Sequence, residues 1–286
     1  MPEARLYDGT TIELEVQGDG PSLLLPVNPR PVEGPQAEEM RRWGADPALG
    51  RTLMDGLRDA FRVVAFDYEG QVLGTPKPDT LTPANVVADL LAVADAAGAD
   101  RFAYYGYSWL ASVGLQLALR TERLSALVMG GFPPLDGPYE EMLRVTAAAN
   151  ELARAPAEPQ PQPPQGSDEP DWSSVTMTLS DAQTRQFLTL YQALQGFDDE
   201  AAQARVSCPR LCFVGSADEI EYDQRWGGVL VSMAGPVVRG RARLEALGWD
   251  VRVLDGLDHT QAMQAAQVLP ILRPWLAANL AGQPLA

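Results

Sequence analysis

Short, continuous apolar runs separate segments of helical periodicity along most of this chain. Runs of this kind are typical of strands that are buried on both faces of a sheet. The intervening segments, such as Pro47–Ala60 and Pro83–Ala97, repeat apolar residues with a helical period. This alternation predicts an α/β fold with a mostly parallel central sheet flanked by helices. The predicted strands are Ser22–Leu25, Phe61–Phe66, Phe102–Tyr105, Leu124–Met129, Arg210–Val214 and Asp250–Leu254, and the last two helices are Val237–Leu247 and Gln261–Leu280.

Two segments depart from this alternation. Thr11–Val16 alternates apolar and polar residues, which predicts a half-exposed edge hairpin. Between residues 133 and 205, helical stretches at Glu140–Ala153 and Ser180–Gln195 bracket a proline-rich loop at 155–171, where proline excludes helix and central strand. We therefore expect one domain over 1–286, with a core of 1–132 and 206–286. The insertion at 133–205 should form a helical cap or lid over the carboxyl ends of the strands, with a mobile loop at 155–171.

Composition and charge narrow the range of partners. The chain has 286 residues and a formal net charge of −16, and it lacks the clustered Lys and Arg that nucleic acid and anionic membranes select. No window approaches the ~20 apolar residues that span a bilayer, and the N-terminus has no signal-peptide pattern. We therefore expect a cytoplasmic protein with a small-molecule partner. Lys77 is its only lysine, a bias typical of a GC-rich bacterial genome.

The two cysteines, Cys208 and Cys212, are predicted to be free. They flank the start of a predicted strand, where four residues of extended chain separate their Cα atoms by ~13 Å. This distance is too long for a disulfide bond, so both thiols should be reduced.

Candidate chemistry begins with a single histidine, His259, which follows Asp258 near the C-terminus. Histidine has an unperturbed pKa near neutral pH, so proton transfer at that pH falls to this residue. Ser108 lies between the apolar run Arg101–Tyr105 and a helical stretch at Ser112–Arg120. A strand, a tight turn and a helix in this order hold a serine Oγ clear of the sheet.

A serine becomes a nucleophile when a base accepts its proton and an acid orients that base. Asp218 is the preferred acid, because it follows the buried strand that ends in Phe213-Val214 and the small-residue turn Gly215-Ser216-Ala217. Other readings stay open. Ser108 can be a helix N-cap, and His259 can be a surface residue. The alternative acids are Glu219, Glu221, Asp223, Asp255 and Asp258.

Over nearly its whole length the chain resembles an α/β-hydrolase. The matching pieces are Gly106-Tyr107-Ser108, Val64-Ala65-Phe66-Asp67-Tyr68-Glu69-Gly70, the turn at Asp218 and Asp258-His259, in the chain order serine, acid, histidine. The resemblance implies an α/β-hydrolase fold with Ser108 as nucleophile, Asp218 as orienting acid and His259 as general base and then acid. It also implies acyl transfer to water through an acyl-serine intermediate, without a cofactor.

The resemblance further implies an oxyanion hole with two donors, the first being the backbone N–H of Trp109. For the second donor, relatives usually carry His-Gly after the strand that corresponds to Leu23–Leu25. This chain instead reads Pro26-Val27-Asn28-Pro29-Arg30-Pro31, and because proline has no N–H, Asn28 becomes the candidate. A second departure is Leu110, which replaces the trailing glycine of the family's Gly-x-Ser-x-Gly.

These features predict a serine hydrolase that cleaves a small ester, thioester or related acyl substrate. No glycine-rich phosphate loop or metal-ligand cluster is visible in the sequence, so we expect neither a cofactor nor a metal. Because the 26–31 loop and Leu110 depart from the family's pattern, a second hypothesis is kept. It is a non-catalytic or weakly hydrolytic ligand-binding or signalling module that retains the hydrolase pocket.

Overall fold

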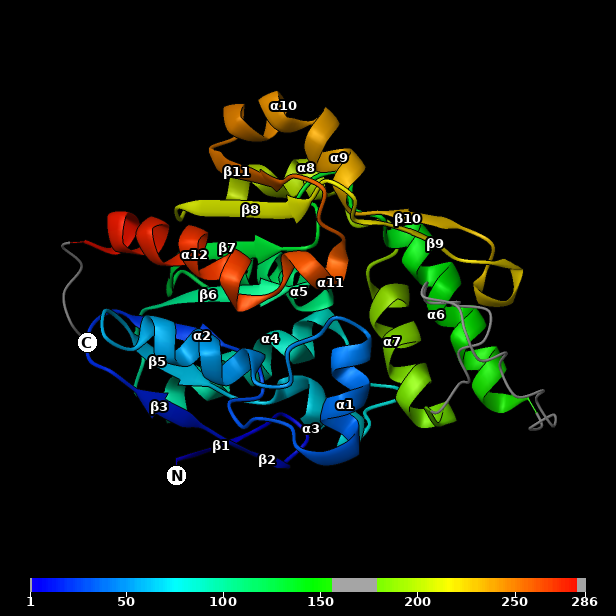
Figure 1. The fold of residues 1–286 in the computed structure, drawn as a ribbon, viewed down its shortest axis with the longest axis horizontal. Helices are drawn as coiled ribbons and strands as arrows, with labels where there is room; N and C mark the ends of the chain where they lie inside the picture. Colours follow the sequence, from blue (N-terminus) through cyan, green and yellow to red (C-terminus); the bar gives the residue numbers. More distant parts are fainter. Residues whose placement is uncertain (1, 156–178, 282–286) are drawn as a thin grey trace.

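A computed structural model describes residues 2–155 and 179–281, and its centre is a seven-stranded sheet (Figure 1). The strand order is β11-β8-β7-β6-β4-β5-β3, and all neighbouring strands are parallel except β3, which runs antiparallel to β5. A mostly parallel sheet is thus confirmed. The strands are β3 (Glu15–Gln17), β4 (Ser22–Leu25), β5 (Arg62–Ala65), β6 (Phe102–Tyr107), β7 (Leu124–Gly130), β8 (Arg210–Gly215) and β11 (Trp249–Leu254).

Helices cover both faces of the sheet, which explains the continuous apolar runs. Along β4, Leu24 faces one layer while Leu23 and Leu25 face the other, and all three are fully buried. The Leu24 face is covered by α4 (Pro83–Ala96), α5 (Trp109–Ala118), α9 (Ala234–Arg239) and α10 (Arg241–Ala246). The opposite face is covered by α2 (Leu49–Leu57) and α12 (Ala265–Leu280). Burial of alternate residues in two hydrophobic layers therefore fixes the register of the sheet.

Several predicted boundaries differ from the structure for local reasons. The helix predicted at 237–247 is two helices, α9 and α10, which meet at Gly240. The helix predicted at 261–280 is divided into α11 (His259–Ala262) and α12. The 11–16 stretch contributes to two sheets: β2 (Thr11–Glu13) pairs with β1 (Glu3–Arg5), and β3 pairs with β5. The prediction of a single edge hairpin was therefore wrong in detail, although the predicted partial exposure of this stretch was right.

Beyond the carboxyl ends of the strands lie helices from the 133–205 segment (Figure 1). They are α6 (Tyr139–Arg154) and α7 (Asp181–Ala193), while the short helix α8 (Asp199–Ala202) of the same segment lies beside the sheet. The buried Asn150 of α6 donates hydrogen bonds to Asp181 and Thr184 of α7, which fixes these two helices against each other. Most of the proline-rich stretch predicted as a loop, residues 156–171, lies outside the described residues.

Further elements that the sequence analysis did not predict complete the fold. They are α1 (Gly34–Arg42), α3 (Tyr68–Gly74), the antiparallel pair β9 (Glu219–Glu221) and β10 (Leu230–Ser232), and the short 3-10 turns Gln203–Arg205 and Gln224–Trp226. The helix α1 begins with a glycine and a proline and buries only Ala37, so its sequence gives little periodic signal.

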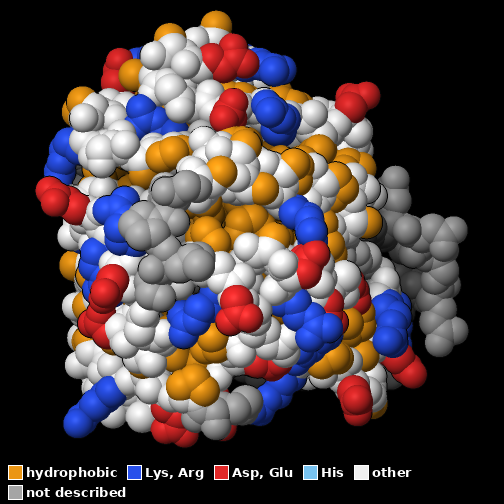
Figure 2. Space-filling view, turned by 90° about the vertical axis from the view of Figure 1, so that its left-hand side faces the viewer, with side chains coloured by type: hydrophobic (Ala, Val, Ile, Leu, Met, Phe, Trp, Pro, Cys, Tyr) orange, Lys and Arg blue, Asp and Glu red, His pale blue; other side chains and the backbone are white. Residues whose placement is uncertain are grey.

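The opposite end of the molecule, where the strands begin, faces the viewer in Figure 2. Side chains of both charge signs are interspersed there with small hydrophobic areas, so the net negative charge is not gathered on this face. Within residues 2–155 and 179–281, no helix combines the length and the apolar content needed to cross a bilayer.

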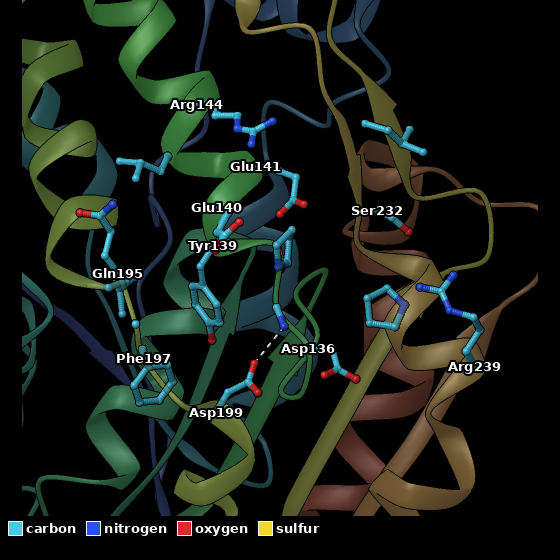
Figure 3. A pocket seen from close by; sticks show the side chains of 17 residues that line it. Asp136, Tyr139, Glu140, Glu141, Arg144, Gln195, Phe197, Asp199, Ser232 and Arg239 are labelled. Atoms are coloured by element: carbon cyan, nitrogen blue, oxygen red, sulfur yellow. Dashed lines mark hydrogen bonds between the residues drawn. The ribbon is translucent and has the colours of Figure 1, made fainter.

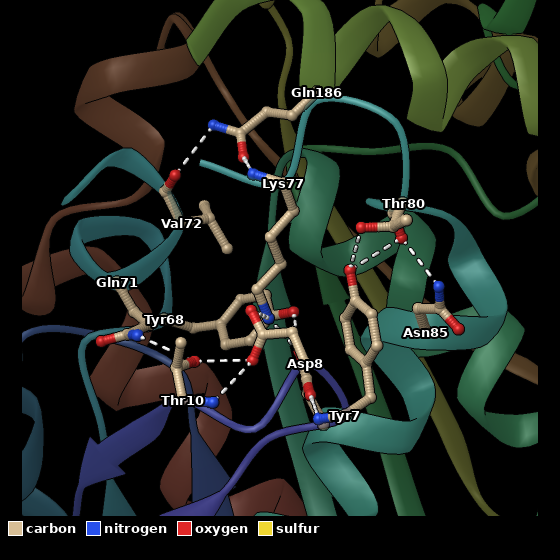
Figure 4. A network of polar contacts seen from close by, with 11 residues as sticks. Tyr7, Asp8, Thr10, Tyr68, Gln71, Val72, Lys77, Thr80, Asn85 and Gln186 are labelled. Atoms are coloured by element: carbon tan, nitrogen blue, oxygen red, sulfur yellow. Dashed lines mark hydrogen bonds and ion pairs between the residues drawn. The ribbon is translucent and has the colours of Figure 1, made fainter. Parts of the chain in front are cut away.

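A buried polar network surrounds Lys77, the only lysine of the chain (Figure 4). Its ammonium group lies 2.8 Å from Asp89 and 3.3 Å from Asp8, and both Lys77 and Asp89 are buried. Asp89 also accepts hydrogen bonds from the Tyr68 hydroxyl and from the backbone N–H of Tyr7. The backbone N–H of Lys77 donates to Gln186 of α7. The network therefore connects the N-terminal hairpin, α3 and α4 to the inserted helices.

We expect Lys77→Met to lower the free energy of unfolding by about 3–5 kcal/mol, because Asp89 would become an uncompensated buried charge. The additional change Asp89→Leu should restore part of the loss, because it removes that charge. Arg241→Ala is the control. It breaks an exposed pair with Glu245 and should cost no more than about 0.5 kcal/mol. Urea unfolding measures all three variants, and a Lys77→Met protein as stable as wild type would contradict a structural role for the pair.

Candidate active site

The turn between β6 and α5 places Ser108 in a strained backbone conformation. Ser108 has φ 57° and ψ −130°, and its N–H donates to the carbonyl of Gly130 on β7. A side chain at Gly106 would clash here, because a Cβ would lie 2.5 Å from the carbonyl oxygen of Leu110. Ser108 thus lies in a tight turn between strand and helix, and the surrounding sheet maintains the strain at the serine. Ser108 makes no side-chain cap hydrogen bond to α5, so the N-cap interpretation is wrong.

Leu110 is accommodated because a glycine occurs one turn later in the helix. A Cβ at Gly114 would lie 2.8 Å from the Tyr104 ring and 3.0 Å from a methyl group of Leu127, so this glycine allows α5 to approach the sheet closely. Leu110 is itself buried, and its carbonyl accepts a hydrogen bond from the Tyr104 hydroxyl. The packing role of the missing glycine is therefore taken by another position of the same helix.

Asp218 lies in the turn after β8, His259 lies in the loop after β11, and the two segments meet at the ends of these strands. Asp218 Oδ2 lies 2.8 Å from His259 Nδ1, and Asp218 is fully buried while the histidine side chain keeps 22% exposure. The other carboxylate oxygen, Oδ1, is buried without a hydrogen-bond partner among the described residues. A buried carboxylate in this position can orient the imidazole and stabilise its protonated form.

The alternative acids have other partners. Asp258 caps α11 by accepting from the N–H of Gln261, and Asp223 accepts from the N–H of Arg225. Glu219 accepts from the Ser232 hydroxyl, and Asp255 contacts the Ser216 hydroxyl at 3.4 Å. Glu221 is exposed on β9. Of these carboxylates, the structure brings Asp218 alone into hydrogen-bond contact with His259 within the described residues.

Tyr107 was not among the residues singled out from the sequence. It fixes the loop that carries His259 to the end of β6. Its hydroxyl donates to the backbone carbonyl of His259 at 2.7 Å, and its ring centroid lies 5.1 Å from the imidazole centroid. Gly131, with φ 61°, makes room for the phenol, because a Cβ there would lie 2.6 Å from the ring. A tyrosine beside the serine was visible in the sequence, but its distant partner was not.

The expected oxyanion donors lie at the same pocket. Trp109 is the first residue of α5, so its backbone N–H has no acceptor within the helix. In the loop after β4, Pro26 has no N–H, and the N–H of Val27 donates to the carbonyl of Leu25. Asn28 is thus the first residue of this loop whose N–H takes no part in the turn's hydrogen bond. Its side-chain oxygen accepts from the N–H of Arg30, which fixes the orientation of the amide.

These residues line a pocket of about 370 Å³. Ser108, His259, Trp109 and Asn28 all contribute to its wall, together with mainly apolar side chains that include Met40 of α1 and Met263 after α11. No hydrogen bond joins Ser108 Oγ to His259 among the described residues, although both face the same space. Apo active sites often have such loose contacts, and they tighten when substrate binds.

A second, larger hollow of about 790 Å³ lies between α6, the 194–199 segment and the β10–α9 region (Figure 3). It is lined by Asp136, Tyr139, Phe197 and Asp199, among others, and neither Ser108 nor His259 reaches it. Burial raises the pKa of the Asp199 carboxyl, whose Oδ2 accepts from the N–H of Gly137. Ser232 also lines this hollow and its hydroxyl donates to Glu219, but the single histidine of the chain lies at the smaller pocket, beside Ser108. The candidate catalytic chemistry is therefore argued for the smaller pocket.

Within residues 2–155 and 179–281, no group of three or more His, Cys, Asp or Glu side chains is arranged to hold a metal ion. Cys208 and Cys212 are both free, as predicted. Burial raises the pKa of the Cys212 thiol to about 12, so this cysteine is protonated and unreactive at neutral pH.

The sheet order and the two helical layers are those of an α/β-hydrolase fold, and the predicted fold class is confirmed. No family model and no curated protein sequence matches the chain. Solved structures do match it in fold. A thermophilic esterase from Thermogutta terrifontis aligns over 98% of both chains with 17% identity and a TM-score of 0.62.

Two further structures with the same fold have different named activities. An enol-lactonase from Burkholderia xenovorans is 16% identical over 96% of this chain and 100% of its own, with a TM-score of 0.60. An epoxide hydrolase from Vigna radiata is 16% identical over 96% of this chain and 97% of its own, with a TM-score of 0.59. At these identities the likeness shows the fold, and the chemistry has to be argued from the site.

The strain at Ser108 leads to a stability prediction. Ser108→Gly should raise the free energy of unfolding by about 1 kcal/mol, because glycine adopts positive φ without steric cost. The matched control is Ser112→Gly in the regular part of α5. It should lose about 0.5–1 kcal/mol, because glycine weakens a helix interior. Thermal unfolding of both variants tests this, and a Ser108→Gly protein that is less stable than wild type would contradict the strained elbow.

Proposed function

We propose that the protein is a serine hydrolase that cleaves a small ester, thioester or related acyl compound through an acyl-serine intermediate. The single observation that carries the proposal is the contact between the buried Asp218 and His259 in the wall of the pocket that Ser108 also lines. The pocket volume of about 370 Å³ is near the lower end of the range for small-molecule sites, which favours a small substrate.

In the proposed reaction, Ser108 Oγ attacks the acyl carbon while His259 Nε2 accepts its proton. Asp218 stabilises the imidazolium through Nδ1. The carbonyl oxygen becomes an oxyanion that accepts hydrogen bonds from the N–H of Trp109 and from Asn28. The bond to the leaving group then breaks, and His259 returns the proton to it. Water attacks the acyl-serine by the same steps and releases the acid and free Ser108.

The residue type at the elbow favours this chemistry among those that the fold supports. A serine with a neighbouring histidine forms an acyl intermediate, whereas covalent chemistry through an enzyme ester of a carboxylate needs Asp or Glu as nucleophile. The elbow position in this chain is a serine. The non-catalytic alternative predicts instead that Ser108 is no more reactive than an ordinary hydroxyl.

A fluorophosphonate probe with intact-mass detection distinguishes the proposed serine hydrolase from the non-catalytic alternative. We expect a single adduct on the wild-type protein and none on Ser108→Ala, because the phosphorus atom reacts with an activated serine. An unlabelled wild-type protein, or an adduct that persists in Ser108→Ala, would overturn the assignment of the nucleophile. The Ser112→Ala variant, which lies on the same helix outside the pocket wall, should label like wild type.

The acid is tested by two matched substitutions. Asp218→Asn should lower kcat on a short p-nitrophenyl ester by orders of magnitude, because an amide cannot stabilise the imidazolium and favours the wrong tautomer. Asp258→Asn should have a mild effect, because its side chain caps α11 and Asn is also a good N-cap. Circular dichroism confirms that both variants fold. If Asp258→Asn is the crippled variant instead, the acid assignment is wrong.

A further inference from the structure

The charges around the candidate active site are all of one sign. Three carboxylate residues line the pocket with Ser108 and His259, namely Asp46, Asp67 and Glu69, and no Lys or Arg is among the lining residues. The net charge of −16 adds a negative background field. A substrate that carries a carboxylate or phosphate near its acyl group would therefore enter against electrostatic repulsion.

Two of these carboxylates are held by local backbone contacts. Asp46 accepts a hydrogen bond from the N–H of Ala48, and Asp67 accepts one from the N–H of Gly70 as the N-cap of α3. Both therefore have a structural role in addition to their charge, and their substitution would disturb the turns that they stabilise.

Glu69 lines the pocket together with Asp67 but has no such capping role. It is in the first turn of α3 and is exposed, and it contacts the indole of Trp109, whose backbone N–H directly follows Ser108. Loss of hydration among the surrounding protein atoms raises the pKa of the Glu69 carboxyl, the Trp109 indole opposes this rise, and Asp67 adds to it. Because Glu69 and Asp67 both line the pocket, a cation beside Glu69 would interact favourably with two carboxylates, and an anion would be repelled by both.

We propose that the pocket selects acyl substrates that are neutral or positively charged and rejects negatively charged ones, and that Glu69 is a specificity-determining residue for this choice. The proposal rests on the proposed hydrolase function. It assigns Glu69 no part in bond making or breaking.

The expected size of the effect follows from the dimensions of the pocket. A sphere of 370 Å³ is about 9 Å across, and two unit charges at that distance change binding by about fivefold at an effective dielectric constant of about 40. Removing the charge of Glu69 should therefore change the relative rates for cationic and anionic substrates by more than fivefold, because the two substrates respond in opposite directions.

Three p-nitrophenyl esters with a common leaving group form the test. They are the neutral ester of butyric acid, the anionic monoester of glutaric acid and the cationic ester of 4-(trimethylammonio)butyric acid. The readout is kcat/KM at pH 8, well above the ordinary carboxyl range, for wild type, Glu69→Gln and Glu141→Gln. The control Glu141→Gln removes the same charge from the larger hollow, which Ser108 does not line.

The ratio of cationic to anionic kcat/KM should fall at least about fivefold in Glu69→Gln and stay near the wild-type value in Glu141→Gln. Comparing each ester across the variants cancels differences in substrate shape. A ratio that is unchanged in Glu69→Gln, or that falls equally in Glu141→Gln, overturns the inference about Glu69. Hydrolysis of the neutral ester by the same proteins would still support the proposed function. If wild type hydrolyses none of the three esters and does not react with the fluorophosphonate, the proposed function itself fails.

Discussion

The pairing of β8 with β11 is the constraint on which the candidate active site depends. The two strands run parallel, with Arg210–Gly215 in register with Trp249–Leu254, and their backbones stay bonded beyond the sheet. Ser216 N–H donates to the carbonyl of Leu254, and Ala217 N–H donates to the carbonyl of Leu257. This approach requires a glycine at 215, because a Cβ there would lie 2.0 Å from the Leu257 oxygen. Asp218 and His259 meet because these two loops are held together, and the Tyr107 hydroxyl then ties the histidine to β6.

The site contains features that cost stability, and the surrounding core compensates for them. The positive φ at Ser108 and the buried Oδ1 of Asp218, which has no hydrogen-bond partner in the described part of the chain, each oppose folding by about 1–3 kcal/mol. Ser108 is bonded to β7 and Asp218 to the end of β8, and the apolar side chains of these buried strands fix the backbone at both positions. For the proposed reaction the second feature is useful. A carboxylate with an incompletely satisfied oxygen gains most from a positive charge on the neighbouring imidazole, which is the charge that forms when Ser108 loses its proton.

The sequence predicted what depends on local pattern and missed what depends on long-range contact. The buried strands were found because two-sided burial leaves continuous apolar runs, and the tight turn at Ser108 was found because strand, glycine and serine are adjacent in the chain. The preference for Asp218 over Asp258 rested on its place after a strand, and the 2.8 Å contact with His259 agrees with it. The short helix α1, the β9–β10 pair and the partners of Tyr107 and Lys77 were not predicted, because their stabilising contacts are made with residues far along the chain.

Trp109 contacts the candidate active site, the buried core and the helix α7. Its backbone N–H is the expected oxyanion donor, while its indole packs 6.2 Å from the Tyr68 ring and edge-on to Phe187 of α7 at 5.4 Å between ring centroids. Tyr68 is in turn bonded to Asp89, the partner of the buried Lys77. The residue that follows Ser108 is thus held by contacts with the core and with α7. Because Trp109 also lines the pocket, the contacts that hold its backbone N–H in place also limit the space beside Ser108. In the proposed function, a small substrate and a fixed oxyanion donor would therefore have one physical origin.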